Sequence, residues 1–409
     1  MNREMKHSGI AWIGDIPNQW EVVRHKNVMH KQKDIQESYH KQDIISLTMG
    51  GVVVRDLNAG GKMPTSFDGY QHVYPNDLLL CLFDIDVTPR CVGLVKNAGV
   101  TSPAYSRFIT HSNAYAPYYD YLLRYIDDYK CFLHLSKNLR SSLTETDFGM
   151  IHTCLPPLAE QKAIADFLDK KCEEIDELVA LQEKIIEELK SYKQSVITET
   201  VCKGLNPNAP MKDSGLDWIG NVPSNWTVCK LKHVYTLLNG RAYSDNELLS
   251  EGKYKILRVG NLFTSDKWYY SDLELEENKY CKEGDLLYGW SASIGPYLWN
   301  DEKVIYHYHI WKVLFTNNRQ FAFYQLQALT EAKRRDMHGS AMQHLTMNGM
   351  NNSFIAIPPL EEQQEIADYL DRKCSEIDQL ISIKQQKIVE LKEYKKSLIY
   401  EYTTGKKEV

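Results

Sequence analysis

The residues best suited to catalysis or metal binding are few and widely scattered. His307 and His309 lie two positions apart in a run, residues 303–315, that alternates like a strand, so their side chains would face the same side, with Asp301 nearby. Spacing places no third ligand beside them, so we expect two structural histidines and no metal site. The nine cysteines include no Cys-x-x-Cys pair, which argues against a zinc finger and suits free thiols in a reducing compartment.

Catalytic sequence motifs are also missing from the chain. Its two Pro-Pro pairs lie in Leu-Pro-Pro-Leu and Ile-Pro-Pro-Leu, whereas an adenine-methylation motif has Asn or Asp before the pair and an aromatic residue after it. Gly61-Lys62 is followed by Met63, so this segment does not complete a phosphate-binding loop. No pattern of carboxylates and lysine indicates a nuclease. We therefore expect a protein without catalytic activity of its own.

Polar side chains in or beside expected loops are the candidates for contacts with nucleic acid. Lys and Arg can reach phosphates, and Arg, Lys, Asn and Gln can bind base edges in the major groove. Any one candidate also suits an ordinary surface position. The candidates are Arg55, Lys62, Arg140 and Ser141 in the first half of the chain, and Arg241, Arg258, Asn261, Ser291, Ser293, Arg334, Arg335, Ser340 and Gln343 in the second half.

An internal repeat organises the elements that must position these side chains. Residues 5–28 match residues 211–234 at 12 of 24 positions, with an offset of 206. Residues 155–199 match residues 357–401 at 25 of 45 positions, with an offset of 202. The stretches between these matches share little beyond an Asp-Leu-Leu sequence that begins at Asp77 and at Asp285. The chain is therefore two copies of one plan, in which a variable globular region precedes a fixed helical region.

Each helical region is expected to form one long helix. After each Pro-Pro pair the chain has no Gly or Pro for more than 40 residues and is rich in Glu, Lys, Leu, Ile and Gln. Such a helix would be roughly 65 Å long, and apolar residues at seven-residue spacing predict that the two helices pair as a coiled coil. We expect antiparallel pairing, with parallel pairing or packing of each helix on its own globular region as the alternatives. The expected contact residues are Leu168, Ile175, Leu178, Ile185, Leu189 and Tyr192 in the first helix, and Leu370, Ile377, Leu380, Leu391, Tyr394 and Leu398 in the second.

Composition and charge exclude several classes of protein. The chain has 409 residues, of which 43% are hydrophobic and 25% charged, and its formal net charge is −6, so it is not a wholly basic DNA-coating protein. No apolar run approaches the ~20 residues that span a bilayer, and the first nine residues lack the apolar segment of a signal peptide. We therefore expect a cytoplasmic protein.

The fold class that follows is α+β, with two mixed, β-rich globular domains joined by two long helices and an internal pseudo-two-fold repeat. The helical regions carry much of the acidity, since residues 155–202 hold 6 Lys and Arg against 11 Asp and Glu. The globular regions are close to neutral, so any DNA contact must come from local basic loops. The expected boundaries are 1–154 and 213–356 for the globular domains, 155–202 and 357–409 for the helical regions, and 203–212 for a linker.

This arrangement resembles the specificity subunit of type I restriction-modification enzymes over nearly the whole chain. The repeated opening and the repeated Pro-Pro segment carry the resemblance. In the first copy they read Trp12-Ile13-Gly14, Pro17 and Trp20, then Leu155-Pro156-Pro157-Leu158, Glu160 and Gln161. Arg140 and the loop from Gly339 to Gln343 match the polar loop that the family places just before its Pro-Pro pair.

The resemblance implies two target-recognition domains, each reading one half of a split, asymmetric DNA target. It also implies an antiparallel coiled coil that sets the spacing of the half-sites and docks the partner subunits. The partners would be two methyltransferase (M) subunits, which use S-adenosylmethionine, and restriction (R) subunits, which use ATP and Mg²⁺; this chain itself would hold no cofactor. The acidic run from Asp169 to Glu177 is either a solvated helix face or part of the methyltransferase docking surface.

Two other functions compete with this interpretation. The near-neutral globular regions would also suit a coiled-coil adapter that binds proteins and not DNA. An enzyme such as a nuclease with an unrecognised site is the second alternative. Salt-dependent duplex binding separates the first from a DNA reader, and metal-dependent cleavage by the isolated chain would identify the second.

Overall fold

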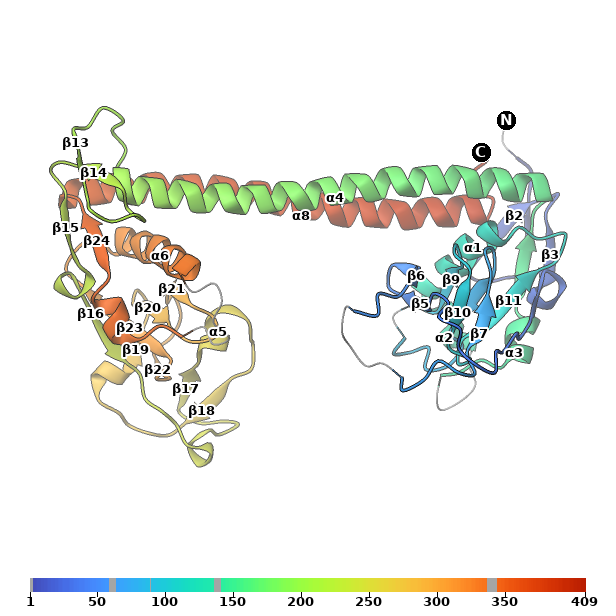
Figure 1. Cartoon of the computed structure of the whole chain (residues 1–409), viewed down its shortest axis with the longest axis horizontal. Helices are drawn as coiled ribbons and strands as arrows, with labels where there is room; N and C mark the ends of the chain where they lie inside the picture. Colours follow the sequence, from blue (N-terminus) through green and yellow to red (C-terminus); the bar gives the residue numbers. More distant parts are fainter. Residues whose placement is uncertain (1–2, 59–63, 89, 136–140, 337–343) are drawn as a thin grey trace. The chain divides into compact units, whose positions relative to one another are not determined.

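The computed structural model describes residues 3–58, 64–88, 90–135, 141–336 and 344–409 (Figure 1). The chain forms two compact units. Unit 1 consists of Met1–Glu183 and Gln386–Val409, and unit 2 of Lys184–Gln385. Helices α4 (Leu158–Lys203) and α8 (Leu360–Thr403) each contribute one half to each unit.

Unit 1 is built on a four-stranded antiparallel sheet with strand order β4-β11-β8-β9. Helix α1 (Ala116–Asp128) covers this sheet with an almost continuous apolar face, on which Tyr118, Leu122 and Ile126 are fully buried. The other helices of unit 1 are α2 (Cys131–Leu135) and α3 (Glu145–Met150). Its strands are β1 (Met5–His7), β2 (Asp15–Pro17), β3 (Glu21–Arg24), β4 (Met29–Lys31), β5 (Ile45–Thr48), β6 (Gly51–Val54), β7 (Gln71–Val73), β8 (Leu78–Leu80), β9 (Val92–Leu94), β10 (Gly99–Thr101), β11 (Ser106–Thr110) and β12 (His152–Leu155).

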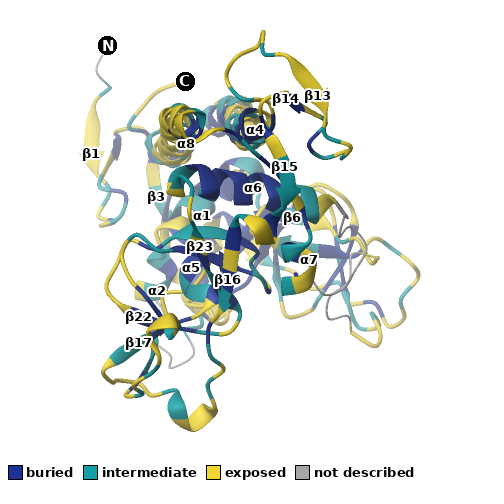
Figure 2. Cartoon of the chain, turned by 90° about the vertical axis from the view of Figure 1, so that its left-hand side faces the viewer, coloured by how far each residue is buried: buried dark blue, intermediate teal, exposed yellow. Residues whose placement is uncertain are grey.

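Unit 2 contains a sheet of the same kind, with strand order β16-β23-β20-β21, and a second sheet in the order β18-β17-β22-β19. Its helices are α5 (Val259–Phe263), α6 (Arg319–Asp336) and α7 (Met347–Asn351). Figure 2 shows α6 largely buried beside the long helices, where it packs on Ile197 and Leu370. The strands are β13 (Met211–Asp213), β14 (Asn221–Pro223), β15 (Thr227–Lys230), β16 (Tyr235–Asn239), β17 (Tyr254–Leu257), β18 (Tyr269–Ser271), β19 (Tyr280–Cys281), β20 (Leu286–Gly289), β21 (Gly295–Leu298), β22 (Val304–Tyr306), β23 (Ile310–Phe315) and β24 (Phe354–Ile357).

The repeat extends into the globular regions, although their sequences share almost nothing there. In unit 1 the central pair β8 and β11 aligns Leu78 with Phe108, and in unit 2 the pair β20 and β23 aligns Leu286 with Val313. Each Asp-Leu-Leu sequence therefore leads into the same central strand of an equivalent sheet. The fold class expected from the sequence, two β-rich domains and two long helices in a repeated plan, is confirmed.

One expected strand is wrong in detail. Residues 303–315 do not form a continuous strand, because a turn at residues 307–309 separates β22 from β23. The Ile310 N–H donates to the carbonyl of His307 at 3.0 Å, and the Tyr308 N–H donates to Arg241 of a neighbouring segment at 3.0 Å. Alternation of side chains along the sequence could not show this turn, since the bond to Arg241 joins residues far apart in the chain.

The two long helices pair antiparallel in each unit. In unit 1, Asp176 of α4 binds Lys395 of α8, and Glu183 lies 3.9 Å from Lys392, so the residue numbers rise on one helix as they fall on the other. In unit 2 the second half of α4 and the first half of α8 share one apolar core. No helix in the described part of the chain is both long and apolar enough to cross a membrane.

The seam between the helices differs by one residue from part of the expected pattern. The series that contains Leu168, Ile175, Leu370, Ile377 and Leu398 is buried, as expected. Leu178, Tyr192, Leu380 and Tyr394 are instead about half exposed, whereas Val179 and Ile186, which follow Leu178 and Ile185 in α4, are buried. Ile185, Leu189 and Leu391 are half-buried. In α4 the second series of contacts therefore lies one residue later than expected.

Candidate nucleic-acid interface

The repeated Pro-Pro segments are the joints that fix each globular domain to a long helix. Gln161, fully buried just after the first pair, accepts a hydrogen bond from the Tyr115 N–H at 2.7 Å and donates to the carbonyl of Pro156 at 2.8 Å. Gln363 makes the equivalent bonds to Asn318 and Pro358 in unit 2. The polar atoms of a buried amide need hydrogen-bond partners. The bonds of this glutamine therefore hold the long helix, the Pro-Pro turn and the globular domain together.

Trp20 and Trp226, the equivalent tryptophans of the two copies, contribute to the same joints. Trp20 Nε1 donates to Glu160 at 2.9 Å, and Trp226 Nε1 donates to Glu362 at 2.9 Å. Both indole rings are buried. The sequence matches that carry the family resemblance therefore position the domains and do not themselves form a site.

Two of the predicted DNA-contact residues of unit 1 lie in described loops. Arg55 follows β6, is half-buried, and its N–H donates to the carbonyl of Ile44 at 2.7 Å. Ser141 has a left-handed backbone, with φ of 45°, and its carbonyl accepts from the Ile85 N–H at 3.1 Å. Lys62 and Arg140 lie outside the described residues.

Two predicted arginines of unit 2 contact aromatic rings. Arg241 binds Glu247 at 2.7 Å and lies 5.1 Å from the centre of the Tyr243 ring. The hydrogen bond from Arg241 is the main reason that the pKa of Glu247 falls to about 2. Arg258 is exposed at the start of α5 and lies 5.3 Å from the Tyr269 ring centre, which leaves its guanidinium accessible to a phosphate.

Other predicted contacts of unit 2 also make internal bonds. Asn261 accepts from the Arg258 N–H at 3.0 Å and donates to the carbonyl of Lys267 at 2.8 Å, so its amide stabilises a loop. Ser291 is buried, and its hydroxyl lies 2.9 Å from Nδ1 of His344. Ser293 is half-buried in the turn between β20 and β21.

Arg334 and Arg335 lie in the last turn of α6. Arg334 pairs with Glu331 and donates to the carbonyl of Ile294 at 2.6 Å. Ser340 and Gln343 lie outside the described residues. Every predicted DNA contact stays a prediction, and together the described ones occupy loops and helix ends in both units.

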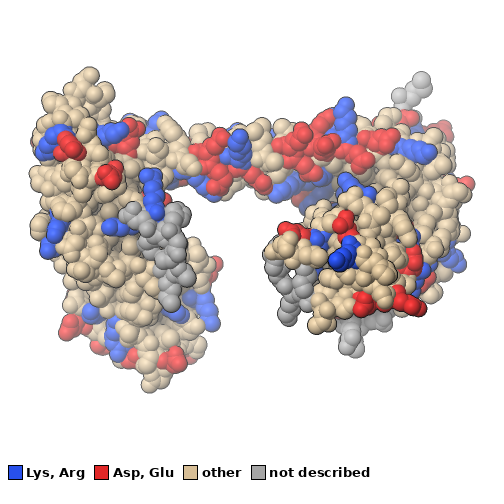
Figure 3. Space-filling model, viewed as in Figure 1, with Lys and Arg blue, Asp and Glu red and all other residues tan. Residues whose placement is uncertain are grey.

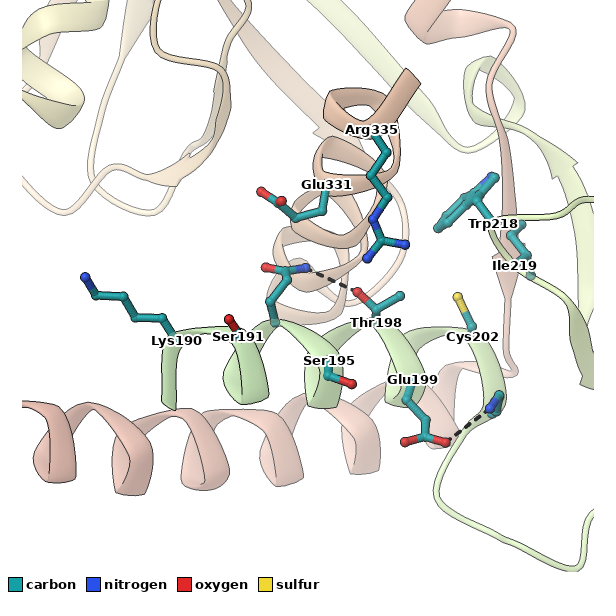
Figure 4. Close-up of a pocket in the computed structure, with 12 residues that line it drawn as sticks. Lys190, Ser191, Ser195, Thr198, Glu199, Cys202, Trp218, Ile219, Glu331 and Arg335 are labelled. Atoms are coloured by element: carbon teal, nitrogen blue, oxygen red, sulfur yellow. Dashed lines mark hydrogen bonds and ion pairs between the residues drawn. The ribbon is translucent and has the colours of Figure 1, made fainter. Parts of the chain in front are cut away.

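Arg335 points into a pocket of about 710 Å³ between α6 and the last turns of α4 (Figure 4). In unit 1 the rings of Tyr125 and Tyr400, 4.9 Å apart, lie beside Trp12. The repeat places Thr198 at the position of Tyr400 in unit 2, and Ala328 of α6 lies in the same apolar core as Trp218. Smaller side chains therefore leave space beside Trp218 that unit 1 fills.

The histidines considered as metal ligands lie in an aromatic cluster. His307 and His309 have ring centres 4.8 Å apart, and Trp290 contacts His309 edge to face at 4.9 Å. Burial lowers the pKa of His307 to about 4, helped by His309 and Arg258, so this ring is neutral at pH 7. In the described part of the chain no three His, Cys, Asp or Glu side chains are grouped to hold a metal ion. The nine cysteines are all free.

Some candidate contact residues that the sequence did not predict lie in or beside the loops directly after the central strands β8 and β20. In unit 1 these are Phe83, Asp84 and Val87, all exposed. In unit 2 the missed residue is His344, which meets the loop after β20. The repeated Asp-Leu-Leu sequence was the available signal, because it marks the strand that leads into each loop.

Charge is distributed unevenly along the chain. Figure 3 shows many acidic side chains on the exposed faces of the two long helices. In the run from Asp169 to Glu177, Glu173, Asp176 and Glu177 are exposed. Such a surface would repel DNA, so base and phosphate contacts are expected from the globular domains.

The chain is similar to known proteins over most of its length. Residues 223–393 match the family model described as type I restriction modification DNA specificity domain. The type I restriction enzyme MjaVIII specificity subunit of Methanocaldococcus jannaschii is 29% identical over 280 residues, which is 63% of this chain and 63% of that protein, less than two thirds of its length. The putative MjaX specificity subunit of the same organism is 25% identical over 96% of this chain and 95% of that protein.

Solved structures share the fold. One is a chain from a type I R-M system studied for its complex assembly and conformational transition, with a TM-score of 0.72 and 16% identity, covering 95% of this chain and 98% of that chain. Another is the HsdS subunit from Thermoanaerobacter tengcongensis, with a TM-score of 0.54, 18% identity and the same two coverages. These comparisons support the resemblance stated from the sequence: the chain is similar to type I restriction-modification specificity subunits in sequence and shares the fold of an HsdS subunit.

Proposed function

We propose that the chain recognises a split, asymmetric DNA sequence for a type I restriction-modification complex, with each globular domain reading one half-site. The observation that carries this proposal is that the two units share one structural frame, which consists of the equivalent four-stranded sheets and the Pro-Pro joints, but differ in their loops. Equivalent sheets and joints repeat in both units, while the loop residues after the central strands differ. One frame with two sets of loops suits two different half-sites, whereas identical loops would suit a palindrome.

The catalytic chemistry belongs to partner subunits in this proposal. Two methyltransferase subunits would bind S-adenosylmethionine, and restriction subunits would bind ATP and Mg²⁺. This chain would supply recognition, and its paired helices would set the separation of the half-sites. The 46 residues of α4 correspond to about 69 Å of helix, longer than one DNA turn of about 34–36 Å, which leaves room for unread base pairs.

Exposed apolar residues on the long helices provide docking positions for the methyltransferase subunits. Leu181 is 49% exposed on α4, and Ile383, its equivalent 202 residues later, is 62% exposed on α8. Leu178 and Leu380 form a second exposed pair. Apolar side chains left outside the seam and repeated at equivalent positions suit two copies of one partner.

The docking proposal predicts a change in stoichiometry. Leu181→Lys should remove one methyltransferase copy from the complex, and Leu181→Lys combined with Ile383→Lys should remove both, as measured by native mass spectrometry. Ala180→Lys is the matched control, because it adds the same charge at the neighbouring exposed position. Two copies retained by the double variant would contradict this docking surface.

Salt-dependent DNA binding tests the function itself. The purified complex with methyltransferase should bind a duplex that carries its target, and the logarithm of the binding constant should fall linearly with the logarithm of salt concentration. Binding to proteins alone, with no affinity for duplex DNA at low salt, would favour the adapter function instead.

A further inference from the structure

The two central strands end in hairpin loops that occupy equivalent positions in the two units. In unit 1 the hairpin of β8 and β9 is closed where the Cys81 N–H donates to the carbonyl of Cys91 at 2.8 Å. In unit 2 the pair Gly289 and Gly295 closes the hairpin of β20 and β21. The first loop is therefore longer than the second, although the strands that carry them share one register.

A second backbone contact ties each loop to the segment before the Pro-Pro joint. The Leu143 N–H donates to the carbonyl of Leu82 at 2.8 Å in unit 1, and the Leu345 N–H donates to the carbonyl of Trp290 at 3.0 Å in unit 2. Leu82 and Trp290 are the first residues of their loops. The frame thus holds both loops at the same place by backbone bonds that do not depend on side-chain type.

Both loops also contain a left-handed residue that is not glycine, at the third position. Asp84 has φ of 47° and Ala292 has φ of 63°. A side chain other than glycine is uncommon in this conformation, although Asp adopts it more readily than most residues, and such positions gather at binding sites. The same unfavourable backbone recurs on different residues, which indicates that the loop geometry is required in both units.

The side chains that the unit 1 loop presents suit base edges. Phe83 is 40% exposed and Val87 is 73% exposed, beside the exposed carboxylates of Asp84 and Asp86. Asp84 has no side-chain hydrogen bond or ion pair to another residue that the structure describes. A carboxylate accepts a hydrogen bond from a base amino group, and an apolar side chain contacts the thymine methyl.

The unit 2 loop presents different chemistry. Ser291 meets His344, which is exposed and whose ring centre lies 6.3 Å from that of Trp290. When the Ser291 hydroxyl donates a hydrogen bond to Nδ1, the neutral imidazole carries its hydrogen on Nε2 and becomes a donor there. A donor at this place suits the N7 or O6 acceptors of a purine.

We infer that these two hairpin loops, together with His344 beside the second loop, read bases. Phe83 and Asp84 determine specificity for one half-site, and Ser291 and His344 for the other. This inference rests on the proposed function and names the residues that carry it. Asp84 selects a cytosine or an adenine, whose amino groups face the major groove, and His344 selects a base with an acceptor there, which excludes cytosine.

Methylation mapping of loop variants tests the inference. The full chain would be expressed with its methyltransferase in cells lacking both, and methylated motifs would be read by long-read sequencing. Asp84→Gly removes the carboxylate and also suits the left-handed backbone, so the loop should stay folded. His344→Phe keeps an aromatic ring against Trp290 and removes the ring nitrogens. Asp43→Asn, an exposed carboxylate outside the loop, is the control.

We expect Asp84→Gly to relax a position of one half-site only, and His344→Phe to relax a position of the other. In competition binding, the wild-type complex should discriminate by about 5- to 150-fold at that position, and the variant should lose this preference. Both variants keeping the wild-type motif, or each altering both half-sites together, would overturn the inference. A wild-type chain that yields no split motif would instead overturn the proposed function, so the two failures are distinguishable.

Discussion

His25 is a titratable side chain with no access to solvent. It lies in the 3-10 turn before β4, and its ring centre is 4.6 Å from that of Phe148. Burial lowers its pKa to about 3, with a smaller contribution from His152. The repeat places Leu231 at the same position of unit 2, equally buried. Unit 1 therefore carries a pH-sensitive core position that unit 2 lacks.

Replacing His25 by leucine should change the acid stability of unit 1. The unfolded chain gains a proton near pH 6.5 while folded His25 stays neutral, so its contribution to the free energy of unfolding falls as pH drops from 6.5 towards 3. At pH 5 the loss is about 2 kcal/mol. Thermal unfolding at pH 7.5 and pH 5 should show a smaller acid-induced drop in Tm for His25→Leu. The exposed His40→Leu is the control, and equal drops in both variants would contradict the account.

At the scale of elements, the sequence predicted the long helices well and their seam only in part. Leu178 and Val179 are neighbours, as are Ile185 and Ile186, so two adjacent series both look apolar. Val179 and Ile186 are the residues that pairing with the other helix buries. The sequence of one helix alone does not determine which of the two adjacent series faces the partner. The pairing of the strands could not be predicted from the sequence either, because β8 and β11 pair residues that lie far apart in the chain.

The seam assignment predicts unequal effects of two neighbouring substitutions. Val179→Ala removes buried methyl groups and should lower the free energy of unfolding by about 1.5 kcal/mol, at about 0.8 kcal/mol per buried carbon. Leu178→Ala, at a side chain 46% exposed, should change it by less than about 0.5 kcal/mol. Chemical denaturation of both variants measures this difference. A larger loss for Leu178→Ala would restore the register expected from the sequence.

At the scale of the whole molecule, the duplication retains the sheets, the Pro-Pro joints and the long helices in both copies, whereas the loops differ between them. Lys193 binds Asp378 at 2.7 Å in unit 2, and Lys395 binds Asp176 at 2.6 Å in unit 1, at positions 202 residues apart. These surface pairs contribute little stability each but repeat the same geometry. The sequence revealed the frame because both copies retain it. It did not reveal Phe83 and His344, since these residues stand at loop positions that share no residue type between the two copies.

We propose that this chain gives a DNA-modifying complex a split, asymmetric target. The most direct measurement is long-read methylation mapping of host DNA with and without the gene for this chain. Deletion should remove one adenine-methylated motif, made of two different half-sites separated by a fixed number of unread base pairs. An unchanged pattern of methylation, with the chain and its methyltransferase both shown to be expressed, would contradict it.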